Sequence, residues 1–268
     1  MVEQIALHAR LVGDRTGRPE ISERVMAVMR QVPRHDFVPA ELRQFAYLDT
    51  PLPIGFEKTI SQPFIVALMT DLLELQPTDS VLEIGTGLGY QAAVLASLSR
   101  KVYSIELLEE LARSAGRRLG DLGIDNIELR TADGSVGWAE HAPYDKILVA
   151  AAPELVPISL LNQLKPGGRM AVPAGIEDAQ QLMVATKNNQ GQLSMDEVLP
   201  VRFSALTTAN LVAPCGGRRR IRVAESRGQP FRSDGARFNR NSRSHGAPLA
   251  PVALPLRSTW PPSRDKSP

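Results

Sequence analysis

Three glycines at alternate positions follow a short apolar segment and precede a helical pattern. Val81–Ile84 reads V-L-E-I, which is typical of a buried strand, and Gly85, Gly87 and Gly89 come directly after it. Tyr90–Leu98 then has helical character. Glycines permit positive φ and let a ligand approach the backbone, and a helix start offers unpaired N–H groups to an anion. The stretch therefore predicts the floor of a cofactor site.

The spacing of these glycines disfavours a dinucleotide. It is G-x-G-x-G, whereas the dinucleotide fingerprint is G-x-G-x-x-G, and no P-loop lysine is present. S-adenosylmethionine carries no phosphate, and it needs partners for its ribose, its adenine amine and its methionyl amino group. Glu106 at a strand end suits the ribose hydroxyls, Asp133 suits the adenine amine, and Glu83 suits the amino group. The ordered set predicts an S-adenosylmethionine site better than the glycines alone.

Each of these positions also has a purely structural interpretation. The glycines could serve only a tight turn, and Glu106 could be a solvated strand end. Asp133-Gly134 could be an ordinary turn, because this pair is common in turns. Glu83 could be a salt-bridged carboxylate inside the fold.

Alternating strand and helix patterns must position these residues. Strands joined through helices predict a parallel sheet with right-handed crossovers, and the last two, joined by a short N-N-Q-G turn, predict an antiparallel edge. Ligands in such α/β sheets bind beyond the carboxyl ends of the strands, where the candidate residues fall. The seven expected strands are Val81–Ile84, Lys101–Glu106, Asn126–Thr131, Asp145–Ala150, Arg169–Pro173, Gln180–Thr186 and Met195–Phe203.

A helical and proline-rich segment precedes the sheet. Apolar residues at helical spacing between Ile21 and Val32 predict an amphipathic helix that ends at Pro33. The proline-rich stretches 32–39 and 47–55 predict an irregular, extended path. After K-T-I-S-Q-P, Ser61 lies where the N-cap of an apolar helix is expected, with Pro63 in its first turn. We expect an N-terminal segment over 1–60, a core domain over 61–212, and a tail over 213–268.

Charge separates the tail from the rest of the chain. Residues 213–268 carry 12 Lys and Arg against 3 Asp and Glu, a net charge of +9, whereas residues 1–212 have a net charge of −7. The tail has no sustained hydrophobic period, so we expect it to be disordered, and a shifted reading frame could produce such a tail. The body has no membrane-length apolar run, no secretory signal and no cysteine pair, which predicts a cytoplasmic protein.

Several motifs together resemble the protein-L-isoaspartate O-methyltransferase family. The resemblance covers about residues 20–208, and the motifs occur in the same order as in the family. They are V-P-R-H-D-F-V-P, T-I-S-Q-P, V-L-E-I-G-T-G-L-G-Y-Q and L-K-P-G-G-R-M-A-V-P-A-G. The resemblance implies a Rossmann-like class I methyltransferase fold of the α/β class, with S-adenosyl-L-methionine as cofactor. It implies a protein repair enzyme that methylates the α-carboxylate of L-isoaspartyl residues in damaged proteins.

The resemblance also implies roles for individual residues. Ser61 matches the active-site serine, and it would fix the substrate carboxylate by a hydrogen bond without acting as a nucleophile. The implied cofactor-binding residues are Thr59, Ile60, Ser61, Glu83, Gly85, Gly87, Glu106, Asp133, Gly134 and Thr207. The stretch G-F-E-K before Thr59 departs from the Gly/Gln-rich version of many bacterial members, and the basic tail has no counterpart.

Two other functions stay open from the sequence. The same cofactor could serve a different protein or small-molecule acceptor. The Arg-rich tail could bind nucleic acid, although it has few aromatic residues and no known binding motif, so we expect no nucleic-acid partner. We further expect a monomer with no metal site and no membrane contact.

Overall fold

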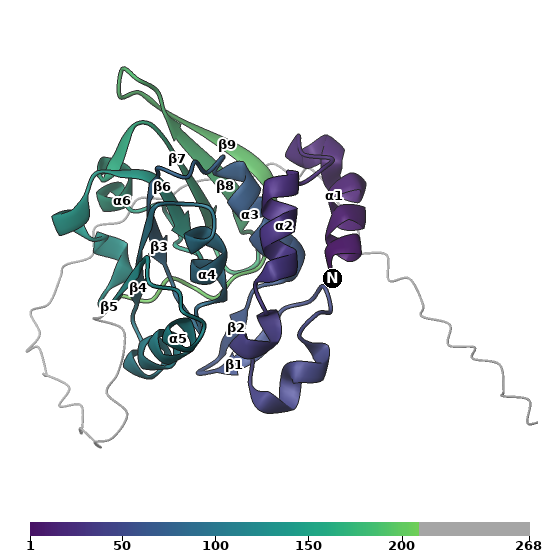
Figure 1. Cartoon of the computed structure of the whole chain (residues 1–268). Coiled ribbons are helices and arrows are strands. Elements are labelled where there is room, and N and C mark those ends of the chain that lie inside the picture. The colour runs from purple at the N-terminus through teal and green to yellow at the C-terminus, as the bar shows by residue number, and fades with distance from the viewer. Residues whose placement is uncertain (209–268) are drawn as a thin grey trace, which may run out of the picture. The chain divides into compact units, whose positions relative to one another are not determined.

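The computed structural model describes residues 1–208, and a seven-stranded sheet is its centre (Figure 1). The strand order is β5-β4-β3-β6-β7-β8-β9, and neighbouring strands from β5 to β7 are parallel. β8 is antiparallel to β7, and β9 is antiparallel to β8, which confirms the predicted antiparallel edge. The strands are β3 Ser80–Ile84, β4 Lys101–Glu106, β5 Ile127–Thr131, β6 Tyr144–Val149, β7 Leu164–Ala174, β8 Gln181–Lys187 and β9 Leu193–Pro200.

Helices cover both faces of the sheet because its strands alternate their apolar side chains between the two faces. On β3, Val81 belongs to the hydrophobic cluster that includes α3, α4 and α5, whereas Leu82 belongs to the cluster that includes α6. The predicted helices at these places are confirmed. Their bounds are α3 Pro63–Leu72, α4 Tyr90–Ala96, α5 Glu109–Asp121 and α6 Ile158–Asn162.

The N-terminal segment packs on the outside of α3. Every residue of α3 is buried, because α1 (Val2–Thr16) and α2 (Glu23–Gln31) cover the side that faces away from the sheet. Ile5 of α1 is fully buried in the same cluster as the sheet residue Val81. The segment therefore shares one core with the sheet. The domain boundaries expected near residues 60 and 212 stay predictions.

The proline-rich stretches are more regular than the sequence indicates. Two short 3₁₀ helices, Arg34–Phe37 and Ala40–Phe45, follow α2. The path expected to be irregular over 47–55 instead contains β1 (Leu52–Gly55), which pairs antiparallel with β2 (Lys58–Ile60). Strand β1 tolerates its proline because β1 and β2 form a separate two-stranded sheet, in which both strands are edge strands, and edge strands accept proline. The resulting β1–β2 hairpin lies beside the carboxyl end of the main sheet (Figure 1).

The predicted tail 213–268 lies outside the described residues. Among residues 1–208, no helix combines the length and the apolar character that crossing a membrane requires.

Candidate active site

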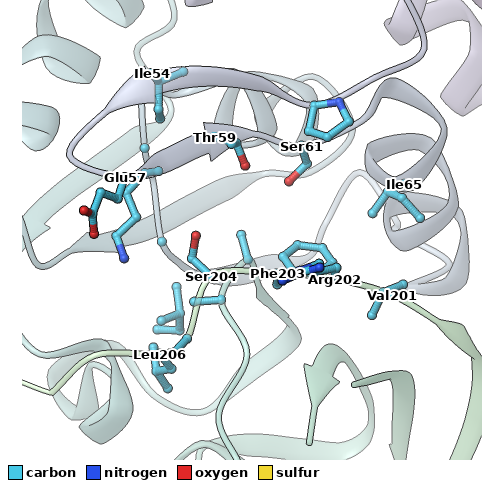
Figure 2. Close-up of a pocket in the computed structure, with 18 of the residues that line it drawn as sticks. Ile54, Glu57, Thr59, Ser61, Ile65, Val201, Arg202, Phe203, Ser204 and Leu206 are labelled. Atoms are coloured by element: carbon cyan, nitrogen blue, oxygen red, sulfur yellow. The ribbon is translucent and has the colours of Figure 1, made fainter. Parts of the chain in front are cut away.

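A cavity of about 970 Å³ opens at the carboxyl ends of the central strands. Its floor comes from the loop after β3 and the end of β4, and its walls come from the β1–β2 hairpin and the segment 199–207. Figure 2 shows the hairpin residues Thr59 and Ser61 on one side and Phe203 and Ser204 on the other. Its size is at the upper end of the usual range for ligand pockets. The cavity can therefore hold a cofactor and part of a second molecule together.

The glycine loop needs its glycines for two reasons. Gly85, Gly87 and Gly89 have φ angles of 92°, 57° and 98°, which side chains rarely adopt. A Cβ on Gly87 would also lie 3.3 Å from Cδ1 of Ile54 in the β1–β2 hairpin. The loop thus places bare backbone at the cavity floor, directly under the hairpin.

Glu106 holds this loop in place while it lines the cavity. Its Oε2 accepts a hydrogen bond from the Gly87 N–H at 2.8 Å, and its Oε1 accepts one from the Leu108 N–H at 3.1 Å. The residue is only 8% exposed, so little water competes for these oxygens. The carboxylate is therefore fixed in orientation, with free lone pairs for a ligand's hydroxyl donors.

Gly134 brings another stretch of backbone to the cavity wall. A Cβ at this position would lie 2.4 Å from Cγ2 of Ile84, closer than any real side chain could lie. Asp133 precedes it and accepts a hydrogen bond from the Ser135 N–H at 2.9 Å. The pair therefore forms a capped turn whose glycine packs against the end of β3.

Glu83 lies inside the fold and does not line the cavity. It is fully buried, and it accepts a hydrogen bond from Ser104, its register partner on β4. Burial raises the pKa of Glu83 to about 8, the Ser104 hydrogen bond offsets part of this, and the charge of Glu106 adds to it. Its Oε1 has no hydrogen-bond partner among the described residues. The neutral carboxyl therefore dominates at neutral pH, and the expected contact with the cofactor's amino group, directly or through water, stays a prediction.

Ser61 follows β2, and its hydroxyl points into the cavity beside that of Thr59 (Figure 2). The expectation that Ser61 caps α3 is wrong. The N-cap is Gln62, and the cap acceptor comes from a distant residue, because Asp49 Oδ1 accepts the Phe64 N–H at 2.8 Å. The Ser61 hydroxyl is thereby left available for a ligand.

Arg34 is the most important residue that the sequence analysis missed. It is fully buried, and its guanidinium donates to the Ala46 carbonyl and to the Ser61 carbonyl, both at 2.8 Å. The same group lies over the ring of Tyr90 in α4, 4.9 Å from the ring centre. Burial lowers the pKa of Arg34 to about 10, so it stays charged at neutral pH. One buried cation therefore links the backbone of Ser61 to the helix that follows the glycine loop.

The opposite wall is anchored by backbone pairing and by one buried amide. Ser204 and Leu206 form hydrogen bonds with Ala152, both at 2.8 Å, so the segment runs as a short parallel bridge beyond β6. Buried Gln180 accepts the Phe203 N–H at 2.7 Å and donates to the Phe203 carbonyl at 3.1 Å. These contacts hold the wall in one position although it follows the last strand.

The structure brings most of the predicted site residues together and leaves three outside the cavity wall. Seven of the ten predicted residues line the cavity: Thr59, Ser61, Gly85, Gly87, Glu106, Gly134 and Thr207. The other three, Ile60, Glu83 and Asp133, do not belong to its lining. Ile60 is 7% exposed and packs into the hydrophobic core. Within the described part of the chain, no group of three or more metal-ligating side chains occurs.

Comparisons with known proteins agree with this arrangement. A family profile described as "Protein-L-isoaspartate(D-aspartate) O-methyltransferase (PCMT)" matches residues 11–211. The Polaromonas sp. protein "Protein-L-isoaspartate O-methyltransferase 1" is 54% identical over 209 residues, which cover 78% of this chain and 89% of that protein. The Syntrophobacter fumaroxidans "Protein-L-isoaspartate O-methyltransferase 2" is 53% identical over 208 residues, which cover 77% and 84%.

Solved structures share the fold. One of a protein-L-isoaspartate O-methyltransferase has a TM-score of 0.66 at 29% identity, over 79% of this chain and 67% of that chain. A Plasmodium falciparum structure, described as a β-aspartate methyltransferase in complex with S-adenosyl-L-homocysteine, has a TM-score of 0.64 at 23% identity, over 77% and 96%. At that identity the second comparison shows the fold alone. From the family profile and the close relatives, the chain belongs to the protein-L-isoaspartate(D-aspartate) O-methyltransferase family.

Proposed function

We propose that the protein transfers a methyl group from S-adenosyl-L-methionine to the α-carboxylate of L-isoaspartyl residues in damaged proteins. One observation carries this proposal above the others. A single cavity joins the Glu106 carboxylate and the bare glycine loop on its floor to the Ser61 hydroxyl on the hairpin wall. A donor and an acceptor can therefore meet inside one cavity, as group transfer requires.

The residues on the floor fit the cofactor. Glu106 offers two oriented carboxylate oxygens, which suit the adjacent hydroxyls of a ribose. Gly85, Gly87 and Gly134 let the ligand contact the backbone, and Thr59 and Thr207 line the walls around it. The contacts expected of Ile60, Asp133 and Glu83 stay predictions, and Glu83 supports the floor from beneath. The cofactor supplies a methyl group activated by a positively charged sulfur.

The acceptor chemistry needs little acid–base help from the protein. A carboxylate is already ionised at neutral pH, so its oxygen attacks without a general base. Ser61 donates a hydrogen bond to the other carboxylate oxygen and fixes the angle of attack, while the walls exclude water. An oxygen–methyl bond forms as the sulfur–methyl bond breaks, and the product is a methyl ester. The ester is lost when a backbone amide nitrogen attacks its carbonyl carbon: a carbon–nitrogen bond forms, the methoxy group leaves with the amide proton as methanol, and hydrolysis of the resulting succinimide restores some normal aspartate.

A paired-peptide assay tests the proposal. The protein is incubated with methyl-labelled cofactor and either an isoaspartyl peptide or its aspartyl twin of identical sequence. We expect labelling of the isoaspartyl peptide alone. Equal labelling of both peptides, or of neither, would favour the alternative of a different protein or small-molecule acceptor.

The remaining expectations about partners belong to this proposal. We propose a cytoplasmic monomer that needs no metal and whose partners are damaged proteins. The nucleic-acid alternative rests on residues 213–268, which lie outside the described part of the chain. Gel filtration tests the monomer, and unchanged activity after treatment with a chelator tests the independence from metal.

A further inference from the structure

His8 reaches the cavity wall from α1, at the start of the chain. Its Nδ1 lies 2.9 Å from Oδ2 of Asp49, and its ring stacks on Phe64, with ring centres 4.5 Å apart and planes inclined by 16°. The side chain is still 39% exposed. The imidazole is therefore held on one edge and one face, and part of it remains open to the cavity.

Asp49 is fixed independently of His8. Its carboxylate also accepts hydrogen bonds from the Phe64 N–H at 2.8 Å and from the Gln62 side-chain amide at 3.0 Å. A carboxylate can only accept, so its contact with His8 requires a proton on Nδ1. When Nδ1 carries the only ring proton, Nε2 has a lone pair that can accept a hydrogen bond. Nε2 has no partner among the described residues, because the polar contacts of the His8 ring, a hydrogen bond to Asp49 and a 3.3 Å approach to the Gln62 amide nitrogen, both involve Nδ1.

The position of His8 places it on the acceptor side of the cavity, by which we mean Ser61 with the β1–β2 hairpin and the segment 199–207. It contacts Gln62, which directly follows Ser61, and its helix α1 packs near β9, which leads into the opposite wall. Among the described residues, the hydrogen bonds and ring contacts of His8 join it to Asp49, Gln62 and Phe64, and not to the glycine loop or Glu106. The family match begins at residue 11, so His8 lies outside the segment that the family profile describes.

We propose that Nε2 of His8 accepts a hydrogen bond from a backbone N–H of the acceptor polypeptide, near its isoaspartyl residue. The inference rests on the proposed function. With its proton on Nδ1, the ring offers Nε2 as an acceptor at the cavity wall, and every acceptor polypeptide carries backbone N–H groups that can donate to it. His8 is therefore a specificity-determining residue that favours polypeptides able to present such an N–H at this point.

Kinetics of the full chain with an isoaspartyl peptide test this role. We expect His8→Ala to raise KM for the peptide by about three- to tenfold, the effect of losing one hydrogen bond. KM for the cofactor and kcat should stay within about twofold, because His8 touches neither the donor side nor the attacking oxygen. The matched control is Leu7→Ala, since Leu7 is 56% exposed on the same helix and does not line the cavity.

A series of ester-substituted peptides sharpens the test. In each peptide, one backbone N–H beside the isoaspartyl residue is replaced by an ester oxygen, which removes a single donor. At one position the replacement should raise KM for the wild type and have no further effect on His8→Ala, because both changes remove the same hydrogen bond. Additive effects at every position, or an unchanged KM in His8→Ala, overturn the inference. If the wild-type protein labels neither the isoaspartyl peptide nor its aspartyl twin, the proposed function is overturned, and this inference with it.

Discussion

The two sides of the cavity are built in different ways. The donor side, formed by the glycine loop, Glu106 and Gly134, follows successive strands of one sheet, and backbone geometry determines its shape. The acceptor side joins segments from both ends of the described chain, and a buried polar side chain fixes each of them: Arg34 binds the Ser61 carbonyl, and Gln180 binds the Phe203 backbone. The donor side therefore depends on local backbone, whereas the acceptor side depends on a few long-range polar contacts.

Replacement of Arg34 is the strongest test of this contrast. Arg34→Met leaves the Ala46 and Ser61 carbonyls without their donor, so we expect the free energy of unfolding to fall by about 3–5 kcal/mol. Urea unfolding measures the loss. Arg30→Met is the control, because Arg30 is exposed and pairs only with Glu23, and its effect should stay within about 0.5 kcal/mol. Equal midpoints for the wild type and Arg34→Met would contradict the dependence on one buried cation.

Glu106→Gln tests the donor side. The amide cannot accept at both of the positions where Glu106 accepts N–H groups, and it has no charge, so one loop contact is lost. We expect the Kd for S-adenosylhomocysteine, measured by calorimetry, to rise by about 30- to 100-fold. Glu110→Gln on the exposed side of α5 should leave the Kd unchanged. If both variants bind as the wild type does, Glu106 has no part in the cofactor site.

Ser61→Ala separates the two sides of the cavity. We expect kcat for an isoaspartyl peptide to fall by about tenfold or more, because the substrate carboxylate loses the hydrogen bond that orients it. The Kd for S-adenosylhomocysteine should change by less than about twofold, since the donor contacts stay intact. Unchanged turnover on the peptide would exclude this role for Ser61, and an equal loss of cofactor affinity would place the serine on the donor side.

Glu83→Gln tests the buried carboxyl on β3, and its effect depends on pH. The folded-state pKa of Glu83 is about 8 against an ordinary value of 4.5, so between these values the folded protein holds a proton that the unfolded chain releases. The stability from this proton is complete below the unfolded pKa and is lost as the pH rises through about 8. In the wild type, we expect this group to lower the free energy of unfolding by up to about 1.4 kcal/mol for each unit by which the pH rises between the two pKa values.

The amide of the variant does not titrate, so its unfolding free energy should vary less with pH. Denaturant unfolding between about pH 5 and about pH 8 measures both proteins. Parallel curves for the wild type and Glu83→Gln would show that the carboxyl is ionised in the folded state.

Much of the donor side could be predicted from the sequence, because its signals are local. The strand Lys101–Glu106 has the expected bounds, and Glu106 ends it at the cavity as expected. The glycines have the expected positive φ angles. The hydrogen bond between Ser104 and Glu83 could not be predicted, since the strand pattern does not show which neighbouring strand places Ser104 beside it.

The acceptor side could be predicted only in part, because its contacts join distant residues. The β1–β2 hairpin was missed since its turn has Phe56 and Glu57 at positive φ, where Asn-Gly is the usual signal. The cap on α3 comes from Asp49, which no spacing rule connects with Phe64. Arg34 occurs in a motif that the sequence analysis quoted, but His35 and Asp36 follow it directly, so the local pattern does not mark it as buried. His8 had no such signal.

The bridge between Ala152 and residues 204–206 has a consequence for the order of synthesis. A ribosome releases the N-terminus first, so the glycine loop and its flanking strands emerge well before this wall. A nascent chain that ends at residue 200 contains the glycine loop, Glu106 and Gly134 of the donor side, but it lacks most of the segment 199–207 that forms one wall of the acceptor side. The protein can therefore acquire its methyl-donor site during translation, but it becomes able to select an acceptor only when its last described residues have emerged.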